Sequence, residues 1–192
     1  TVPGGSILGL IGENGAGKST LIKSMLGIAK PSGGSVTLLG VDPDHAKEDI
    51  GIVMDDCFFS EYLRVKDVSS VLSRVYRDWD KALFQSYLDK FSVAGAKSIK
   101  ELSRGMRMKL SLAAALAHRP KLLLLDEATA GLDPVVRDEI LDEFLEFISD
   151  SDHAILISSH ITSDLEKVAD YIAYLHQGKL LMYDEKDRLL ES

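Results

Sequence analysis

Gly12-Glu13-Asn14-Gly15-Ala16-Gly17-Lys18-Ser19-Thr20 fits the phosphate-binding pattern Gly-x-x-x-x-Gly-Lys-Ser/Thr. An apolar run at Ser6–Ile11 precedes it and has the pattern of a buried strand, and Leu21–Leu26 follows as a helix that Gly27 ends. A chance glycine-rich turn is the alternative, but eight fixed positions between a strand and a helix argue against it. The stretch therefore predicts a binding site for a nucleoside triphosphate.

Each residue type in this loop suits phosphate chemistry. Gly12, Gly15 and Gly17 allow backbone turns that side chains exclude, and they let the chain approach an anion closely. The loop's N–H groups then wrap the phosphates at the positive end of the following helix. Lys18 adds a full positive charge aimed at the β- and γ-phosphates, and the Ser19 hydroxyl is placed to bind Mg²⁺.

Composition indicates one soluble globular domain. The 192 residues are 45% hydrophobic and 27% charged, and the net charge of −8 argues against a nucleic-acid partner. A single cysteine, Cys57, allows no internal disulfide, and no apolar run approaches the roughly 20 residues that span a bilayer. The chain begins at Thr1 and enters a strand almost at once, so we expect a domain that is incomplete at its N-terminus.

Apolar runs and helical patterns alternate along the chain and predict an α/β fold. The expected fold is that of a P-loop NTPase, with a mainly parallel sheet flanked by helices, antiparallel edge strands and an inserted α-helical subdomain. We expect a single domain over 1–192, with a RecA-like core over 1–57 and 104–192 and the helical subdomain over 58–103. The expected strands lie at 6–11, 35–39, 50–54, 122–125, 154–158, 171–175 and 180–183.

A second anchor of the site is the pair Asp126-Glu127, which ends a run of four leucines. A carboxylate at the tip of a buried strand can hold Mg²⁺ opposite Ser19, so Asp126 is a predicted metal ligand. Glu127 can activate the attacking water as a general base. An acidic strand cap is the alternative, and the phosphate loop upstream favours the catalytic interpretation.

Three further motifs follow in a fixed order. Leu102-Ser103-Arg104-Gly105-Met106 resembles the signature motif Leu-Ser-Gly-Gly-Gln, Gly131-Leu132-Asp133 resembles a D-loop, and Ser159-His160 resembles a switch histidine. Together with the phosphate loop and Asp126-Glu127, this ordered set resembles the ATP-binding cassette (ABC) ATPases. The resemblance covers nearly the whole chain.

The resemblance implies an ATPase that works as a pair. In the family two cassettes pack head to tail, and each ATP lies between the phosphate loop of one and the signature of the other. By this resemblance Ser103 and Gly105 contact the γ-phosphate bound on the opposite subunit, and Asp133 couples the two sites. His160 contacts the γ-phosphate and acts with Glu127 and Lys18 in hydrolysis. The implied ligands are ATP and Mg²⁺.

Three positions depart from the family pattern in ways that bear on the mechanism. Asp55 stands where the family usually has Gln; it can still hold a magnesium-bound water, so it is a candidate metal ligand, and a plain strand cap is the alternative. Arg104 replaces a glycine of the signature, and Met106 replaces its glutamine. Arg104 either adds charge near the opposite phosphate or is a solvated side chain, and the sequence favours neither.

Within the family, the chain most resembles ATP-binding subunits of bacterial exporters of the antibiotic or bacteriocin type. The resemblance rests on the short helical insert, on Asp55, and on Trp79-Asp80 ahead of Phe84. It implies transport through a separate transmembrane permease, with export as the expected direction and import as the alternative, and with the chain peripheral on the cytoplasmic face of the membrane. Cys57-Phe58-Phe59 is a candidate docking surface for the permease, and packing of these residues into the core is the alternative.

A non-transport ABC ATPase is the competing interpretation. DNA-maintenance members carry a long coiled-coil insertion, and the roughly 45 residues between Asp55 and Leu102 are too few for one. Translation-associated members have tandem cassettes and basic surfaces, against the net charge of −8 here. In the family the aromatic residue that stacks on adenine lies upstream of the phosphate loop, before Thr1. We therefore expect this chain to bind nucleotide weakly and with poor base selectivity.

Overall fold

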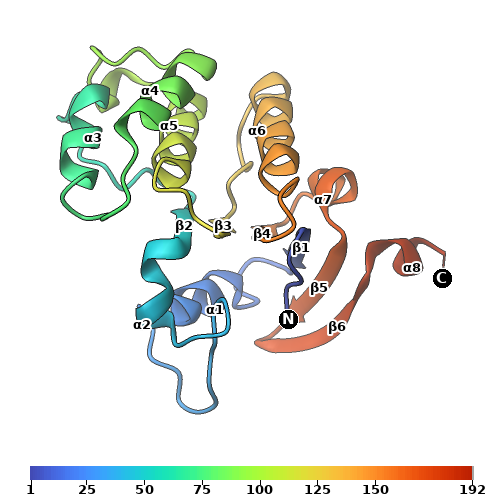
Figure 1. The fold of residues 1–192 in the computed structure, drawn as a ribbon. Coiled ribbons are helices and arrows are strands. Elements are labelled where there is room, and N and C mark those ends of the chain that lie inside the picture. The colour runs from blue at the N-terminus through green and yellow to red at the C-terminus, as the bar shows by residue number, and fades with distance from the viewer. Residues whose placement is uncertain (192) are drawn as a thin grey trace.

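Figure 1 shows the computed structural model, which describes residues 1–191. The strands are β1 (Ser6–Ile11), β2 (Ile50–Val53), β3 (Leu122–Asp126), β4 (Ala154–Ser159), β5 (Tyr171–His176) and β6 (Lys179–Glu185). The α-helices are α1 (Lys18–Met25), α2 (Pro43–Ala46), α3 (Val65–Leu72), α4 (Lys81–Lys90), α5 (Arg104–Leu116), α6 (Pro134–Phe147), α7 (Thr162–Val168) and α8 (Lys186–Leu190), with short 3₁₀ turns at Lys47–Asp49 and Ile99–Glu101.

The strands form one six-stranded sheet in the order β2-β3-β4-β1-β5-β6. Neighbours from β2 to β5 are parallel, and β6 pairs antiparallel with β5 at the edge. The predicted α/β class, with a mainly parallel sheet and an antiparallel edge, is confirmed. Because β1 to β4 run the same way, the loops that follow them emerge at one edge of the sheet, where open α/β folds bind ligands.

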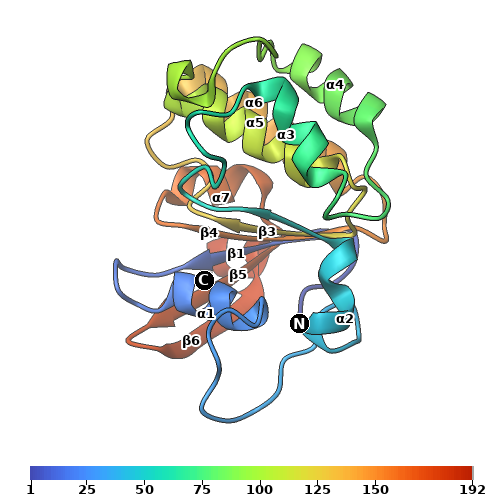
Figure 2. The same ribbon diagram turned by 90° about the vertical axis from the view of Figure 1, so that its left-hand side faces the viewer.

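Helices cover both faces of the sheet. Figure 2 shows α3 to α7 above it and α1 and α2 below it. Each face has its own hydrophobic cluster: Ile7, Leu123 and Ile155 point into the cluster on one side, and Leu8, Leu124 and Leu156 into that on the other. This alternation is the period of two expected of a strand buried on both faces.

Helix α5 lies close against β2, because β2 has a glycine at the contact. A Cβ on Gly51 would lie 2.9 Å from the carbonyl oxygen of Ala115 in α5 and 2.5 Å from Leu123 Cδ2. The close approach brings the start of α5 towards the end of β2. Helices α3 and α4 of the 58–103 segment pack on α5, and their buried residues Val68, Phe84 and Leu88 belong to the same hydrophobic cluster as the sheet.

The predicted strand at Ser35–Leu39 is wrong. Only an isolated bridge between Leu38 and Val41 forms there, and this segment pairs with none of the sheet strands. Leu39 and Gly40 both adopt positive φ angles, of 53° and 81°, which turn the chain back at once. The segment has an alternating pattern but no neighbouring strand to pair with.

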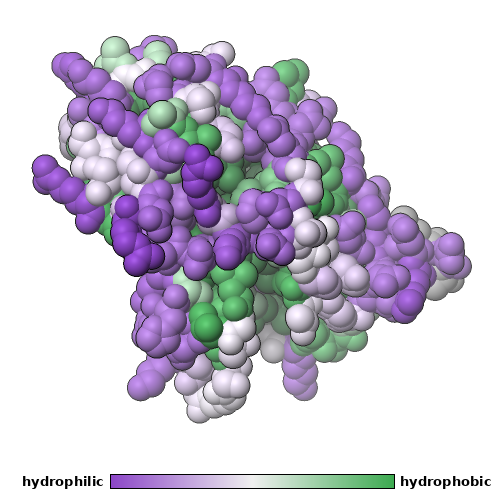
Figure 3. Space-filling view, viewed as in Figure 1, coloured by the Kyte–Doolittle hydropathy of each residue, from purple (hydrophilic) through white to green (hydrophobic). Residues whose placement is uncertain are grey.

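Hydrophilic residues cover the helical layer at the upper left of Figure 3, whereas hydrophobic surface is visible below it. The edge strand β6 exposes a run of apolar side chains, which are Leu180, Leu181, Met182 and Tyr183. Within residues 1–191, no helix combines the length and the hydrophobicity needed to cross a bilayer.

A buried carboxylate ties α4 to α6. Glu143 of α6 is only 3% exposed, and Lys90 of α4 lies 2.7 Å from its Oε2 while also contacting the exposed Glu146. Burial raises the pKa of the Glu143 carboxyl, and the Lys90 charge opposes that rise. Lys90 is therefore the group that allows Glu143 to stay ionised in the interior.

We predict that Lys90→Ala lowers the free energy of unfolding by about 2 kcal/mol at pH 7, because it leaves a buried carboxylate without its cation. The deficit should shrink as the pH falls through the raised pKa of Glu143, since removing Lys90 raises that pKa further and protonated Glu143 needs no partner. Urea unfolding at several pH values measures both effects. Glu146→Ala is the control and should change stability by less than about 0.5 kcal/mol; equal losses in the two variants would contradict the prediction.

Candidate active site

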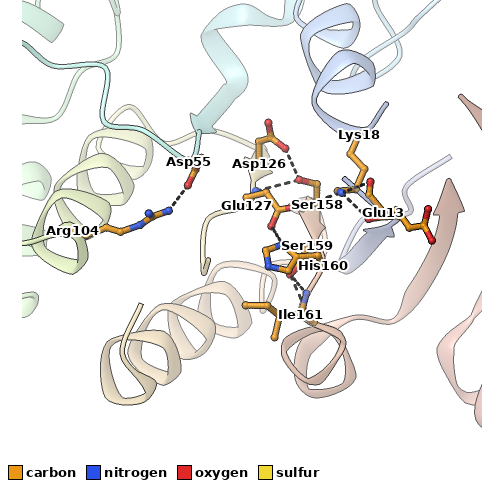
Figure 4. Close-up of polar contacts among 11 residues, drawn as sticks. Glu13, Lys18, Asp55, Arg104, Asp126, Glu127, Ser158, Ser159, His160 and Ile161 are labelled. Carbon is orange, nitrogen blue, oxygen red and sulfur yellow. Dashed lines mark hydrogen bonds and ion pairs between the residues drawn. The ribbon is translucent and has the colours of Figure 1, made fainter. Parts of the chain in front are cut away.

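Four loops meet at the carboxyl edge of the sheet, and they carry most of the predicted site residues. Lys18 follows β1, Asp55 follows β2, Glu127 follows β3 and His160 follows β4 (Figure 4). They surround a cavity of about 340 Å³. Its lining residues are Asn14, Gly15, Gly17, Lys18, Ser19, Thr20, Asp55, Arg104, Glu127, Ala130 and His160.

The phosphate loop has the backbone geometry that its glycines predict. A Cβ on Gly12 would lie 2.4 Å from the carbonyl oxygen of Leu175, so no other residue fits there without movement. Gly17 has a φ of 106° and Gly15 a φ of 81°, and nothing lies within 4 Å of a Cβ placed on Gly15. The loop is thus tightly packed behind and open in front, which suits the binding of an anion on its N–H groups.

Lys18 is held inside this loop. It is 6% exposed, and its Nζ donates to the carbonyl oxygens of Gly12 at 2.8 Å and Glu13 at 3.3 Å. The ammonium group also lies 3.5 Å from Oε1 of Glu127. The Lys18 ammonium group is therefore fixed within the loop, where its positive charge can attract an incoming anion.

Glu127 connects two of the predicted catalytic residues. Its Oε2 lies 2.6 Å from Nδ1 of His160, and its Oε1 faces Lys18. The Glu127 backbone has a positive φ of 53°, and its N–H donates to the carbonyl oxygen of Ser158 at 3.1 Å. Strained backbone of this kind is common where a side chain must be aimed at a site. The residues that sequence predicts for hydrolysis therefore form one contact cluster.

Asp126 precedes Glu127 at the end of β3 and has a partner that the sequence did not reveal. It is 5% exposed, and its Oδ1 accepts a hydrogen bond from the Ser158 hydroxyl at 2.5 Å. The same hydroxyl accepts from the N–H of Glu127 at 3.1 Å. Asp126 and Ser158 are paired in the β3–β4 register, and only knowledge of that register would have identified Ser158 from sequence.

The donor atoms at this edge fit a magnesium ion, although the chain does not enclose one by itself. Ser19 supplies a hydroxyl and Asp126 a carboxylate, both hard oxygen ligands of the kind that Mg²⁺ prefers. Across residues 1–191, no group of three or more His, Cys, Asp or Glu residues could hold a metal. Such a site suits an ion that takes its other ligands from phosphates and water.

The three predicted site residues at the starts of α5 and α6 lie outside the cavity of this chain. Ser103 caps α5 and accepts from the N–H of Met106 at 3.3 Å, and Asp133 caps α6 and accepts from the N–H of Val136 at 3.1 Å. Gly105 allows α5 to approach α6, because a Cβ there would lie 3.1 Å from Val136 Cγ1. None of the three lines the phosphate cavity.

Comparison with known proteins identifies related chains. The ABC transporter family model matches residues 1–130. An uncharacterized ABC transporter ATP-binding protein of Nostoc, all4389, is 36% identical over 100% of this chain and 60% of its own length. The lantibiotic transport ATP-binding protein SrtF of Streptococcus pyogenes is 33% identical over 97% of this chain and 82% of its own length. This chain thus spans less than two thirds of the Nostoc protein.

The fold is also similar to solved structures. A structure described as the ATP-binding subunit of an ABC transporter superposes with a TM-score of 0.88 at 25% identity. The match covers 100% of this chain and 83% of that one.

Ser158→Ala should weaken both the fold and the site, because it leaves the buried Asp126 carboxylate without its donor. We expect a loss of about 1–3 kcal/mol in unfolding free energy and a weaker dependence of nucleotide binding on Mg²⁺. Ser159→Ala is the control, since Ser159 is equally buried but its hydroxyl bonds only to the backbone of Ile161. Titration of a fluorescent ATP analogue with and without Mg²⁺ tests this; an equal magnesium dependence in both variants would refute the role given to Ser158.

Proposed function

The chain belongs to the ABC transporter family, and from this we propose that it is the ATP-hydrolysing subunit of a transporter, working as a dimer that closes around two ATP molecules. The contact cluster of Lys18, Glu127 and His160 inside the phosphate cavity carries this proposal. The cluster supplies a cation, a carboxylate and an imidazole at the expected position of the γ-phosphate of a bound triphosphate.

In this proposal each residue has a distinct task during hydrolysis. Lys18 leaves Glu127 and neutralises charge on the β- and γ-phosphates, and the N–H groups of the loop hold the same oxygens. Glu127, released by Lys18, accepts a proton from the attacking water. His160 holds the Glu127 carboxylate through Nδ1 and contacts the γ-phosphate. A bound Mg²⁺, held by Ser19 and Asp126, would stabilise negative charge on the transferring phosphate.

The dimer completes the site from the other side. Ser103, Gly105 and Asp133 lie outside the cavity of their own chain, so they are free to serve a second copy. The N-terminus of α5 behind Ser103 would then face the γ-phosphate of that copy. Closing on ATP and opening after hydrolysis would be the motion that drives transport.

We expect Glu127→Gln to lower kcat by at least about 100-fold, because it removes the general base. Nucleotide affinity should stay within about threefold, since Gln keeps the size of the side chain and removes a charge that competes for Lys18. Phosphate release and nucleotide titration on the same samples measure the two quantities. The control is Glu139→Gln on α6, where the carboxylate pairs with Lys109 outside the cavity. An active Glu127→Gln chain would exclude Glu127 as the base.

Coupling to a separate permease is the second part of the proposal. An apolar cavity of about 290 Å³ lies between β2 and the helical segment, lined by Leu26, Ile28, Ile52, Val53, Met54, Phe58, Phe59, Leu72, Tyr76, Ser111, Ala114 and Ala115. At its rim Phe58 is 73% exposed and Ile28 is 70% exposed, whereas Phe59 packs on the core. Exposed aromatic side chains at an apolar cavity suit a protein partner. Through this contact the chain would lie on the cytoplasmic face of the membrane. Export is the proposed direction, because the relative SrtF is a lantibiotic transport ATP-binding protein.

Phe58→Asp should release the chain from its membrane partner without changing nucleotide binding, because Phe58 lies outside the phosphate cavity. Fractionation of cells that express the full-length protein measures the share bound to membranes. Leu145→Asp on α6, which changes another exposed apolar side chain, is the control. Unchanged membrane association in Phe58→Asp would place the docking surface elsewhere.

A further inference from the structure

Two of the positions at which this chain departs from the family pattern, Asp55 and Arg104, contact each other. Arg104 is the first residue of α5, and its Nη2 forms an ion pair and a hydrogen bond with Oδ1 of Asp55 beyond the end of β2. Figure 4 shows the Arg104 side chain extending from its helix towards Asp55. The pair joins the signature segment to the phosphate cavity of the same chain.

Arg104 also covers the D-loop segment. A Cβ on Gly131 would lie 3.3 Å from Cζ of Arg104, so the guanidinium lies directly against this glycine. Gly131 has a φ of 68°, a conformation that strains other residues. One side chain thus contacts the loop after β2 and the loop after β3, on the same side of the cavity.

The pair stands where phosphates would enter. Arg104 and Asp55 line the same cavity as Lys18, Ser19 and His160. Both carboxylates of that lining already have cations, because Glu127 contacts Lys18 while Asp55 contacts Arg104. An entering triphosphate would compete with Glu127 for Lys18, and the Mg²⁺ that enters with it would compete with Arg104 for Asp55.

We propose that Arg104 and Asp55 form a latch in cis, which keeps the start of α5 on its own chain's cavity until a nucleotide binds there with Mg²⁺ and draws the Asp55 carboxylate away from the guanidinium. The proposal rests on the proposed function, because the released segment is the one that would serve the second copy. It makes each chain's signature available only after that chain's own phosphate loop is loaded.

The strength of the pair suits a latch. Arg104 is 51% exposed and Asp55 is 55% exposed, and ion pairs at such positions are weak and reversible. Asp55 is a predicted magnesium ligand, so it would turn to the Mg²⁺ that enters with a triphosphate and leave the Arg104 guanidinium. The freed guanidinium would then be able to bind phosphate of the second copy through two parallel hydrogen bonds.

Cys57 provides a reporter for this movement. It is the single cysteine of the chain, is partly buried, and lines a second cavity of about 330 Å³ together with Asp55, Arg104 and Arg107. Opening of the latch removes one wall of that cavity. The reaction rate of Cys57 with a bimane thiol reagent therefore reports on the Arg104–Asp55 contact without any hydrolysis.

The experiment compares this rate with and without a non-hydrolysable Mg²⁺-ATP analogue, at protein concentrations where light scattering shows a monomer. In the wild-type chain, the analogue should speed the labelling of Cys57 about fivefold. An exposed ion pair is strong enough to shift the balance between the closed and the open pair by about that factor. Arg104→Gln and Asp55→Asn should label fast without nucleotide and respond less than about twofold. The exchanged pair, Asp55→Arg with Arg104→Asp, should restore slow labelling in the absence of nucleotide.

Arg107→Gln is the matched control, because Arg107 lines the Cys57 cavity from the same helix but not the phosphate cavity. It should keep the full nucleotide response. Nucleotide binding without any change in wild-type labelling would overturn the latch alone, as would an Arg104→Gln chain that responds like the wild type. Failure of the wild-type chain to bind the analogue, followed by fluorescence in the same samples, would overturn the proposed function and the latch with it.

Discussion

The parallel pairing of β1, β3 and β4 is the constraint on which the site depends. β4 lies between β3 and β1 and pairs with both, so the ends of these strands are aligned residue by residue. Asp126 lies opposite Ser158, and Ile11 lies opposite Ser159. A one-residue slip in either pairing would turn the neighbouring side chains to the opposite face of the sheet. The phosphate loop, the acidic pair and His160 meet because this register holds.

Charge neutralisation within the cavity follows from that convergence. The sheet edge gathers two carboxylates and two cationic side chains, Lys18 and Arg104, into a small volume, and each carboxylate takes one of them as its partner. Lys18 illustrates the consequence, since its ammonium is buried and satisfied by two carbonyl oxygens and by Glu127. Because each of these charges has a partner within the chain, an entering anion would exchange partners rather than meet bare charge. Hydrolysis and the latch would both use such exchanges.

Sequence predicted the local elements of the site well, because each depends on its own residues. The glycines of the phosphate loop need particular backbone angles, and four leucines before Asp126 form a buried strand. Contacts between distant segments were not predictable in the same way. The Arg104–Asp55 pair spans 49 residues and depends on how closely Gly51 lets α5 approach β2. The false strand at 35–39 failed for the same reason, since pattern alone does not supply a partner strand.

The central claim is that ATP is held between the phosphate loop of one chain and the signature of another. The mass of the Glu127→Gln chain in solution, measured by light scattering with and without Mg²⁺-ATP, tests it most directly. The account predicts a shift from monomer to dimer on adding ATP, and the shift should vanish with Ser103→Arg but persist with Ser103→Asn, which keeps the helix cap. A chain that binds ATP and stays monomeric, or a dimer that survives Ser103→Arg, would contradict the account.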